Sequence, residues 1–210
     1  MFTNKIYFYL LLCFTPIGLF SYTIFPESQR AHAYLDGLRG LEIGGSAHNP
    51  FGLKTLNVDY TDSPFTFFKQ TEISLCGTYL KVDLVAPGDR LPFKDNTWDF
   101  VLSSHVIQYF YDPVRALKEW LRVVKPGGYV FIIAPHKERT FEWNKPRTSL
   151  SEIVERHNHP NPLVFDQHTH HCVWTTQDFL DICEYYHWNV LECDDIDDKV
   201  GNGFMVILKK

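Results

Sequence analysis

The pattern of apolar and polar positions divides the chain into a leading apolar segment and one long α/β region. From residue 27 onward, short apolar runs typical of strands alternate with stretches of helical periodicity. The clearest run covers 98–103, where apolar residues follow one another almost without a break, as in a strand buried on both faces. Further strands are expected at 41–43, 55–59, 81–85, 129–134, 189–193 and 204–208.

The most regular predicted helix covers 113–124. Apolar residues recur along it three or four positions apart, and Pro113 follows Asp112, a natural N-cap. Helices are also expected at 28–38 and at about 176–187. Because strands and helices alternate, we expect an α/β domain with a mostly parallel sheet. Ligands of such sheets bind beyond the carboxyl ends of the strands.

Residues 1–26 differ from the rest. The stretch 6–25 is 20 residues long, has no charge, and holds 15 apolar or aromatic residues. A membrane anchor needs about 20 apolar residues, although Pro16 and Gly18 weaken this interpretation. A secretory signal, a buried N-terminal helix and an upstream start codon are the alternatives. We therefore divide the chain into a hydrophobic segment, 1–26, and a domain, 27–210.

Composition and charge exclude several classes of protein. The chain has 210 residues, 45% of them hydrophobic and 21% charged, which suits one globular domain and excludes a disordered tail. The formal net charge of −5 provides no basic field, so nucleic acid is not expected as a partner. The five cysteines are odd in number and form no C-x-x-C pair, which favours a reducing compartment and a cytoplasmic domain.

The ends of the predicted strands share one chemistry. The first strand runs from Glu42 into a Gly44-Gly45 turn, and glycine allows a ligand to approach the backbone closely. The second ends at Asp59, 17 residues after Glu42, about where a ribose diol is held in dinucleotide-type folds. Asp83 follows on the third strand. Acidic strand ends without a Walker lysine motif suit a nucleoside-like ligand that carries positive charge.

In these features the sequence resembles the class I S-adenosylmethionine-dependent methyltransferases, over about residues 30–210. The motifs that carry the resemblance are Leu-Glu-Ile-Gly-Gly at 41–45, Asn-Val-Asp at 57–59, Leu-Pro-Phe at 91–93 followed by Trp-Asp-Phe-Val at 98–101, and Lys-Pro-Gly-Gly at 125–128. The resemblance implies a Rossmann-like, seven-stranded, mostly parallel sheet with helices on both faces and an antiparallel last strand. It also implies S-adenosylmethionine as the cofactor.

The resemblance assigns roles to individual residues. Glu42, Gly44 and Gly45 would line the methionine part of the cofactor, and Asp59 would bind the ribose hydroxyls. The adenine would contact Asp83 and Leu84, and Ser103 would lie near the sulfonium with His105.

The acceptor side is predicted from histidines. His105 follows the fourth strand and His136 the fifth, so both could face the transferred methyl group and act as the general base that a hydroxyl acceptor needs. Asp166, His168 and His170 also suit zinc or manganese, but such alternating residues bind one ion only on an extended backbone. Because solvated loop histidines are commoner, no metal is predicted.

The sequence thus predicts an enzyme that transfers a methyl group from S-adenosylmethionine to a small-molecule or glycan acceptor, most favourably at oxygen. One alternative is a catalytically inactive methyltransferase fold that acts as a binding module tethered to a membrane through residues 6–25. A dinucleotide-dependent reductase is disfavoured because the first turn lacks G-x-G-x-x-G.

Overall fold

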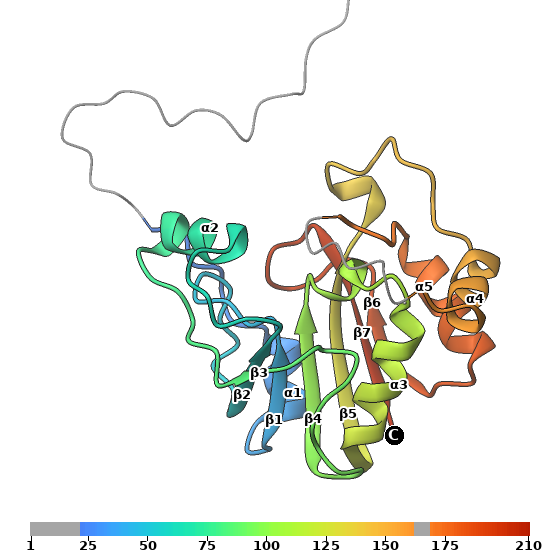
Figure 1. The fold of residues 1–210 in the computed structure, drawn as a ribbon, viewed down its shortest axis with the longest axis horizontal. Helices are drawn as coiled ribbons and strands as arrows, with labels where there is room; N and C mark the ends of the chain where they lie inside the picture. Colours follow the sequence, from blue (N-terminus) through green and yellow to red (C-terminus); the bar gives the residue numbers. More distant parts are fainter. Residues whose placement is uncertain (1–21, 162–168) are drawn as a thin grey trace, which may run out of the picture.

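The computed structural model describes residues 22–161 and 169–210, and its centre is one seven-stranded sheet (Figure 1). The strand order is β3-β2-β1-β4-β5-β7-β6. β7 pairs antiparallel with β5 and with β6, and the remaining pairs are parallel. The strands are β1 (Gly40–Ile43), β2 (Thr55–Asp59), β3 (Leu84–Val85), β4 (Trp98–Ser104), β5 (Val124–Pro135), β6 (Val190–Asp194) and β7 (Gly203–Lys209).

Helices cover both faces of the sheet, as the sequence predicts. The helices are α1 (Gln29–Leu35), α2 (Phe67–Cys76), α3 (Pro113–Val123), α4 (Leu150–Asn158) and α5 (Thr176–Tyr185). Two single 3-10 turns follow β4 and β5, η1 (Ile107–Tyr109) and η2 (Lys137–Arg139). Buried residues of α3, α4 and α5 share one apolar cluster, while α1 packs in a second cluster with the other side chains of β4 and β5. The Rossmann-like architecture with an antiparallel strand is thereby confirmed.

Local sequence explains where the best-predicted helices begin. Asp112 caps α3 by accepting a hydrogen bond from the backbone N–H of Arg115, and Pro113 occupies the first turn, where no N–H is needed. Thr175 and Asp178 form a reciprocal capping box at the start of α5. Both helices then bury one apolar face against the sheet.

Four features differ from the sequence prediction. β3 contains only Leu84–Val85, because the residues before it contact β2 outside the ladder. β5 starts at Val124 and includes the glycine turn, where Gly127 has a φ of 81°. α2 and α4 lie where the sequence analysis predicts no helix. The pattern of α2 is misleading because its two charged residues point into the protein, as described below.

The described end of the leading segment packs on the domain. The backbone N–H of Thr23 donates to the carbonyl of Leu75 at the end of α2, and that of Phe25 donates to the carbonyl of His48. Residues 1–21 lie outside the described residues, so the interpretation of 6–25 stays a prediction. Among the helices of the described ranges, none has the length and apolar character to cross a membrane.

Candidate functional site

The carboxyl ends of three adjacent parallel strands meet at one edge of the sheet. β1 lies between β2 and β4, with Ile43 opposite Val58 on one side and opposite Ser103 on the other. The turn after β1, the end of β2 and the end of β4 are therefore neighbours, at the upper edge of the sheet in Figure 1. This is the position at which parallel α/β sheets bind ligands.

The turn after β1 favours glycine at Gly44 by its backbone and at Gly45 by close packing. Gly44 has a φ of +68°, and a Cβ there would lie 2.7 Å from a methyl group of Val106. A Cβ on Gly45 would lie 2.9 Å from the side chains of Glu42 and Asn57. The backbone N–H of Gly45 donates to Oδ1 of Asn57 at 3.0 Å, which holds the turn against β2.

Glu42 is a buried carboxylate beneath this turn, with 7% of its surface exposed. Thr55 donates its hydroxyl to Oε2 of Glu42 at 3.0 Å. Burial raises the pKa of Glu42, although the Thr55 hydrogen bond and the charges of Lys199 and Lys69 oppose the shift. The carboxylate is therefore fixed in place and lies in an environment of low dielectric constant.

Asp59 ends β2 with a largely buried carboxylate. Its Oδ1 accepts a hydrogen bond from the backbone N–H of Tyr60 at 2.8 Å, and its Oδ2 lies 4.0 Å from Nζ of Lys69. Burial raises the pKa of Asp59, and the N–H of Tyr60 and the charge of Lys69 partly oppose this. The carboxylate can accept further hydrogen bonds, as a ribose diol would require.

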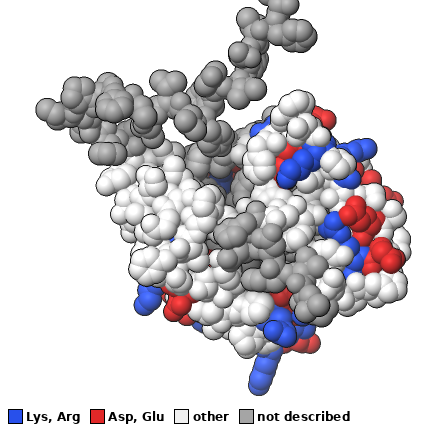
Figure 2. Space-filling view, turned by 45° about the horizontal axis from the view of Figure 1, so that its top comes forward, with Lys and Arg blue, Asp and Glu red and all other residues white. Residues whose placement is uncertain are grey.

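Helix α2 places a buried ion pair against the same turn, which the sequence analysis missed. Lys69 and Glu72 are 5% and 2% exposed, and Nζ lies 3.1 Å from Oε2. Nζ also donates to the carbonyl oxygens of Gly45 and Leu80, at 3.3 and 3.2 Å. The other oxygen of Glu72 accepts the backbone N–H groups of Ala47 and Leu80. The two charged residues of α2 are therefore buried and contact the glycine turn. The molecular surface on the side of α2 shows few charges (Figure 2). The i, i+3 spacing of the pair was the only available sequence signal.

Asp83 and Leu84 lie beside β2, with Asp83 in a structural contact. Its Oδ2 accepts the backbone N–H of Asn57 at 2.9 Å, and its own N–H donates to the Asn57 carbonyl at 2.9 Å. Leu84 begins β3 and packs partly against the core. The Asp83 carboxylate therefore extends the sheet edge, and its predicted contact with adenine remains a prediction.

Ser103 and His105 present buried polar atoms at the end of β4. Ser103 is fully buried, and its Oγ has no hydrogen-bond partner within the described protein. His105 has a left-handed backbone, with a φ of 55°, and its buried Nε2 also lacks a partner there. Burial lowers the pKa of His105 to about 4, so its imidazole is neutral at pH 7. Such atoms are rare in folded proteins and suit a site that a bound molecule completes.

His136 lies at the end of β5, where its neighbours are not the residues at the ends of β1 and β2. Its Nδ1 accepts the backbone N–H of Glu138 at 3.2 Å, and its Nε2 lies 3.8 Å from a carboxylate oxygen of Asp195. Together with Arg139 and the start of α5, it lines a cavity of about 450 Å³. None of the residues that line this cavity belongs to β1, β2 or the glycine turn.

A second cluster, also missed by the sequence analysis, contains Glu142. This carboxylate is 1% exposed, and its Oε2 lies 2.9 Å from Nδ1 of His170. The His170 ring contacts Tyr109, with 4.6 Å between ring centroids. Asp166 and His168, the other members of the alternative metal site, lie outside the described residues. In the ranges 22–161 and 169–210, no group of three His, Cys, Asp or Glu residues is arranged to hold a metal ion.

Comparison with known proteins agrees with this geometry. Residues 47–132 match a family model described as a methyltransferase domain. A 113-residue stretch, 50% of the chain, is 33% identical to 2-methyl-6-phytyl-1,4-hydroquinone methyltransferase 1 of Oryza sativa subsp. japonica, of which it covers 33%. A 69-residue stretch, 33% of the chain, is 42% identical to 29% of demethylmenaquinone methyltransferase from Streptomyces griseus. The chain therefore aligns with less than half the length of these curated relatives.

Solved structures share the fold at low sequence identity. A S-adenosylmethionine-dependent methyltransferase of Thermotoga maritima, described as a possible histamine N-methyltransferase, aligns over 86% of both chains with a TM-score of 0.51 and 22% identity. The [4+2]-cyclase SpnF aligns over 86% of this chain and 77% of its own, with a TM-score of 0.54 and 16% identity. The family match and the shared fold agree with the predicted family: residues 47–132 carry a methyltransferase domain, and the chain has the fold of S-adenosylmethionine-dependent methyltransferases.

Proposed function

We propose that the protein transfers a methyl group from S-adenosylmethionine to a hydroxyl group of a small-molecule or glycan acceptor. The observation that carries the proposal is a pair of carboxylates, the buried Glu42 and the largely buried Asp59, on either side of the glycine turn. S-adenosylmethionine supplies an activated methyl group on a positively charged sulfur, and a nucleoside with positive charge suits carboxylates rather than a phosphate-binding loop.

The residues at this edge fit the cofactor. The turn at Gly44 and Gly45 lets a ligand approach the backbone, and Asp59 has oxygen lone pairs for two ribose hydroxyls. Near β4, the unpartnered Oγ of Ser103 and Nε2 of His105 are buried polar atoms that a bound molecule would satisfy. We assign Asp83 and Leu84 to the adenine end, beside β2.

The acceptor is proposed from its chemistry. Two curated relatives are named as methyltransferases of a hydroquinone and of demethylmenaquinone, which supports a small-molecule acceptor. A hydroxyl must lose a proton as it attacks, and a positioned imidazole is the usual base. His105 and His136 are both proposed to line the acceptor route, at the ends of β4 and β5.

The chief alternative is an inactive methyltransferase fold that binds a ligand or partner without turnover. SpnF, described as a [4+2]-cyclase, shares the fold, so the fold alone does not establish methyl transfer. Attachment to a membrane through residues 6–25 is compatible with either function, and so is a cytoplasmic location of the domain.

Calorimetric titration of the full chain with S-adenosylmethionine and with S-adenosylhomocysteine tests the proposal. Micromolar binding of both compounds is expected. The absence of binding in a folded sample would contradict the proposal. Binding combined with no S-adenosylhomocysteine production from any hydroxylated acceptor would favour the inactive alternative.

A further inference from the structure

A buried carboxylate–imidazole pair joins two segments that are distant in sequence. Glu142 follows η2, and His170 precedes α5 by six residues. The Glu142 side chain is 1% exposed and that of His170 is 9% exposed, with 2.9 Å between Oε2 and Nδ1. The carboxylate oxygen lies outside the ideal hydrogen-bond direction of the ring nitrogen. Lys145 supports the carboxylate from the other side, with Nζ 3.1 Å from Oε1.

Burial distinguishes this pair from a surface ion pair. His159 and Glu155 of α4 have the same chemistry at 3.0 Å, but their side chains are 73% and 71% exposed. An exposed pair of this kind contributes under about 1 kcal/mol. Removing a carboxylate from water costs far more, so a protein tolerates it only where charged partners compensate. Burial alone would raise the pKa of Glu142, yet its interactions with His170 and Lys145 outweigh this and lower it.

The pair lies at the carboxyl edge of the sheet, beside the cofactor turn. Tyr109 of η1 contacts the His170 ring on one side and Phe68 of α2 on the other, with 4.6 and 5.4 Å between ring centroids. Phe68 is the neighbour of Lys69, whose Nζ contacts the Gly45 carbonyl. His170 therefore packs, through Tyr109, against α2, the helix whose Lys69 contacts the glycine turn.

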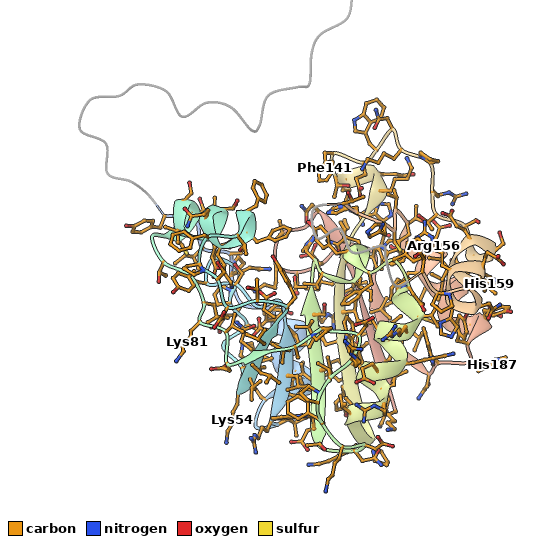
Figure 3. The ribbon with its side chains drawn as sticks, viewed as in Figure 1. Lys54, Lys81, Phe141, Arg156, His159 and His187 are labelled. Atoms are coloured by element: carbon orange, nitrogen blue, oxygen red, sulfur yellow. The ribbon has the colours of Figure 1, made fainter. Side chains whose placement is uncertain are left out.

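An exposed aromatic ring flanks the pair. The ring of Phe141 lies 5.3 Å from that of His170 and is 71% exposed, over the upper ends of the central strands in Figure 3. An exposed ring beside a buried polar pair can hold a ring-shaped molecule by stacking while its hydroxyl reaches the imidazole.

We propose that His170 is the general base of this enzyme, that Glu142 is its positioning residue, and that the acceptor is a hydroxylated ring held against Phe141. This inference rests on the proposed methyl transfer and names the acceptor site. The ring is that of a phenol or of a sugar, because both present a hydroxyl beside a flat or apolar face.

The proposed step conserves atoms and charge. The acceptor oxygen forms a bond to the methyl carbon while the carbon–sulfur bond breaks and its electron pair stays on sulfur. The hydroxyl proton moves to Nε2 of His170, and the carboxylate of Glu142 at Nδ1 stabilises the resulting imidazolium. The proton then leaves to solvent with the methylated product and S-adenosylhomocysteine.

His105 is a weaker base for this step. Its pKa of about 4 lies far below the pH at which the enzyme works, and efficient general bases have a pKa near that pH. The charged and titratable groups that face His170 are Glu142, Tyr109, His105 and, through Glu142, Lys145. His105 would then shape the pocket, with Nε2 available to a bound molecule.

The first test is the tautomer of His170, from nitrogen NMR of histidine-labelled full-length protein, with the signal assigned by loss in His170→Asn. Because Nδ1 faces Glu142, the proton is expected on Nδ1 and Nε2 is expected to be bare. Glu142→Ala should abolish this preference. A neutral ring with its proton on Nε2 in the wild-type protein would overturn the inference, whatever the acceptor is.

The second test is kinetic, with catechol and methyl α-D-glucopyranoside as probe acceptors and S-adenosylhomocysteine formation as the readout. His170→Asn should lower kcat at least about 100-fold, the usual contribution of a general base. Glu142→Gln should lower it less and shift the pH profile. The matched exposed variants His159→Asn and Glu155→Gln should retain wild-type kcat. Which probe reacts distinguishes a phenolic from a sugar acceptor.

The outcomes separate this inference from the proposed function. Each variant should bind S-adenosylmethionine within about twofold of the wild type, because neither residue contacts the glycine turn. Loss of binding in the wild type would refute methyl transfer itself. If His170→Asn still binds S-adenosylmethionine and keeps more than half of the wild-type kcat, His170 is not the general base, and the proposed methyl transfer is unaffected. If neither probe is methylated, the tautomer of His170 alone decides whether the inference holds.

Discussion

The two halves of the carboxyl edge are built in different ways. The proposed cofactor half is made from the turn after β1 and the end of β2, which are 15 residues apart from Gly44 to Asp59. The proposed acceptor half brings Tyr109, Glu142 and His170 together from three segments. Under the proposed function, the cofactor-binding residues lie in short sequence motifs, whereas the acceptor-binding residues are brought together only by tertiary packing.

The largest expected effect lies in the cofactor half, at Lys69. Lys69→Met leaves the buried carboxylate of Glu72 without its cation, and breaking such a pair costs about 3–5 kcal/mol. Urea unfolding of the variant measures this loss. Lys125→Met is the matched control, since its partner Asp99 is solvent-accessible and under about 1 kcal/mol is expected. Equal losses in both variants would show that α2 does not hold the turn.

A slightly smaller effect is expected at the boundary between the halves, from the protonation of His105. Its pKa is lowered from 6.5 to about 4 by burial, so the unfolded chain binds the proton more tightly than the folded protein. Stability contributed by the neutral ring is therefore present above pH 6.5 and is lost as the pH falls towards 4. At one pKa unit per 1.36 kcal/mol, the total loss is about 3 kcal/mol.

The variant His105→Asn isolates this titration. Asparagine tolerates the left-handed backbone at this position, so the fold is expected to survive. Its unfolding free energy should vary less between pH 6.5 and 4 than that of the wild type, while His159→Asn should leave the wild-type slope unchanged. An unaltered slope in His105→Asn would show that the ring is not buried as described.

The smallest expected effect is the difference in stability between Gly44→Ala and Gly37→Ala, which separates the cost of overpacking at the glycine turn from that of backbone strain. Gly37 and Gly44 both have positive φ, of 77° and 68°, but only Gly44 has a neighbour, Val106, where a Cβ would be placed. Both alanine variants bear the same backbone strain, and Gly44→Ala bears an overpacking cost of about 1–3 kcal/mol in addition. Urea unfolding measures the difference, and equal midpoints would contradict close packing of the turn.

Sequence reasoning succeeded where the structure is local. The ends of β2 and the caps of α3 and α5 follow from patterns within a few residues, and the motif at 41–45 lies at the predicted strand end. The seven-stranded, mostly parallel sheet with an antiparallel last strand also follows from the family resemblance.

Sequence reasoning failed where charged residues are buried, because it expects charged side chains at the surface. Lys69 and Glu72 are charged and buried, so α2 lacks the apolar stripe by which helices are recognised. Glu142 looks like an ordinary loop carboxylate until His170, 28 residues later, is folded onto it. The predicted roles of Glu42, Asp59, Ser103 and His136 are consistent with their positions and stay predictions.

The most direct test of the central claim is a calorimetric titration of S-adenosylmethionine into the wild type, Asp59→Ala and Asp62→Asn. Loss of charge-assisted hydrogen bonds costs about 1.5–3 kcal/mol, so Asp59→Ala should weaken binding at least tenfold. Asp62 is exposed three residues further along, and its variant should bind like the wild type. Unchanged affinity in Asp59→Ala would remove Asp59 from the site and contradict the placement of the cofactor at the β1–β2 edge.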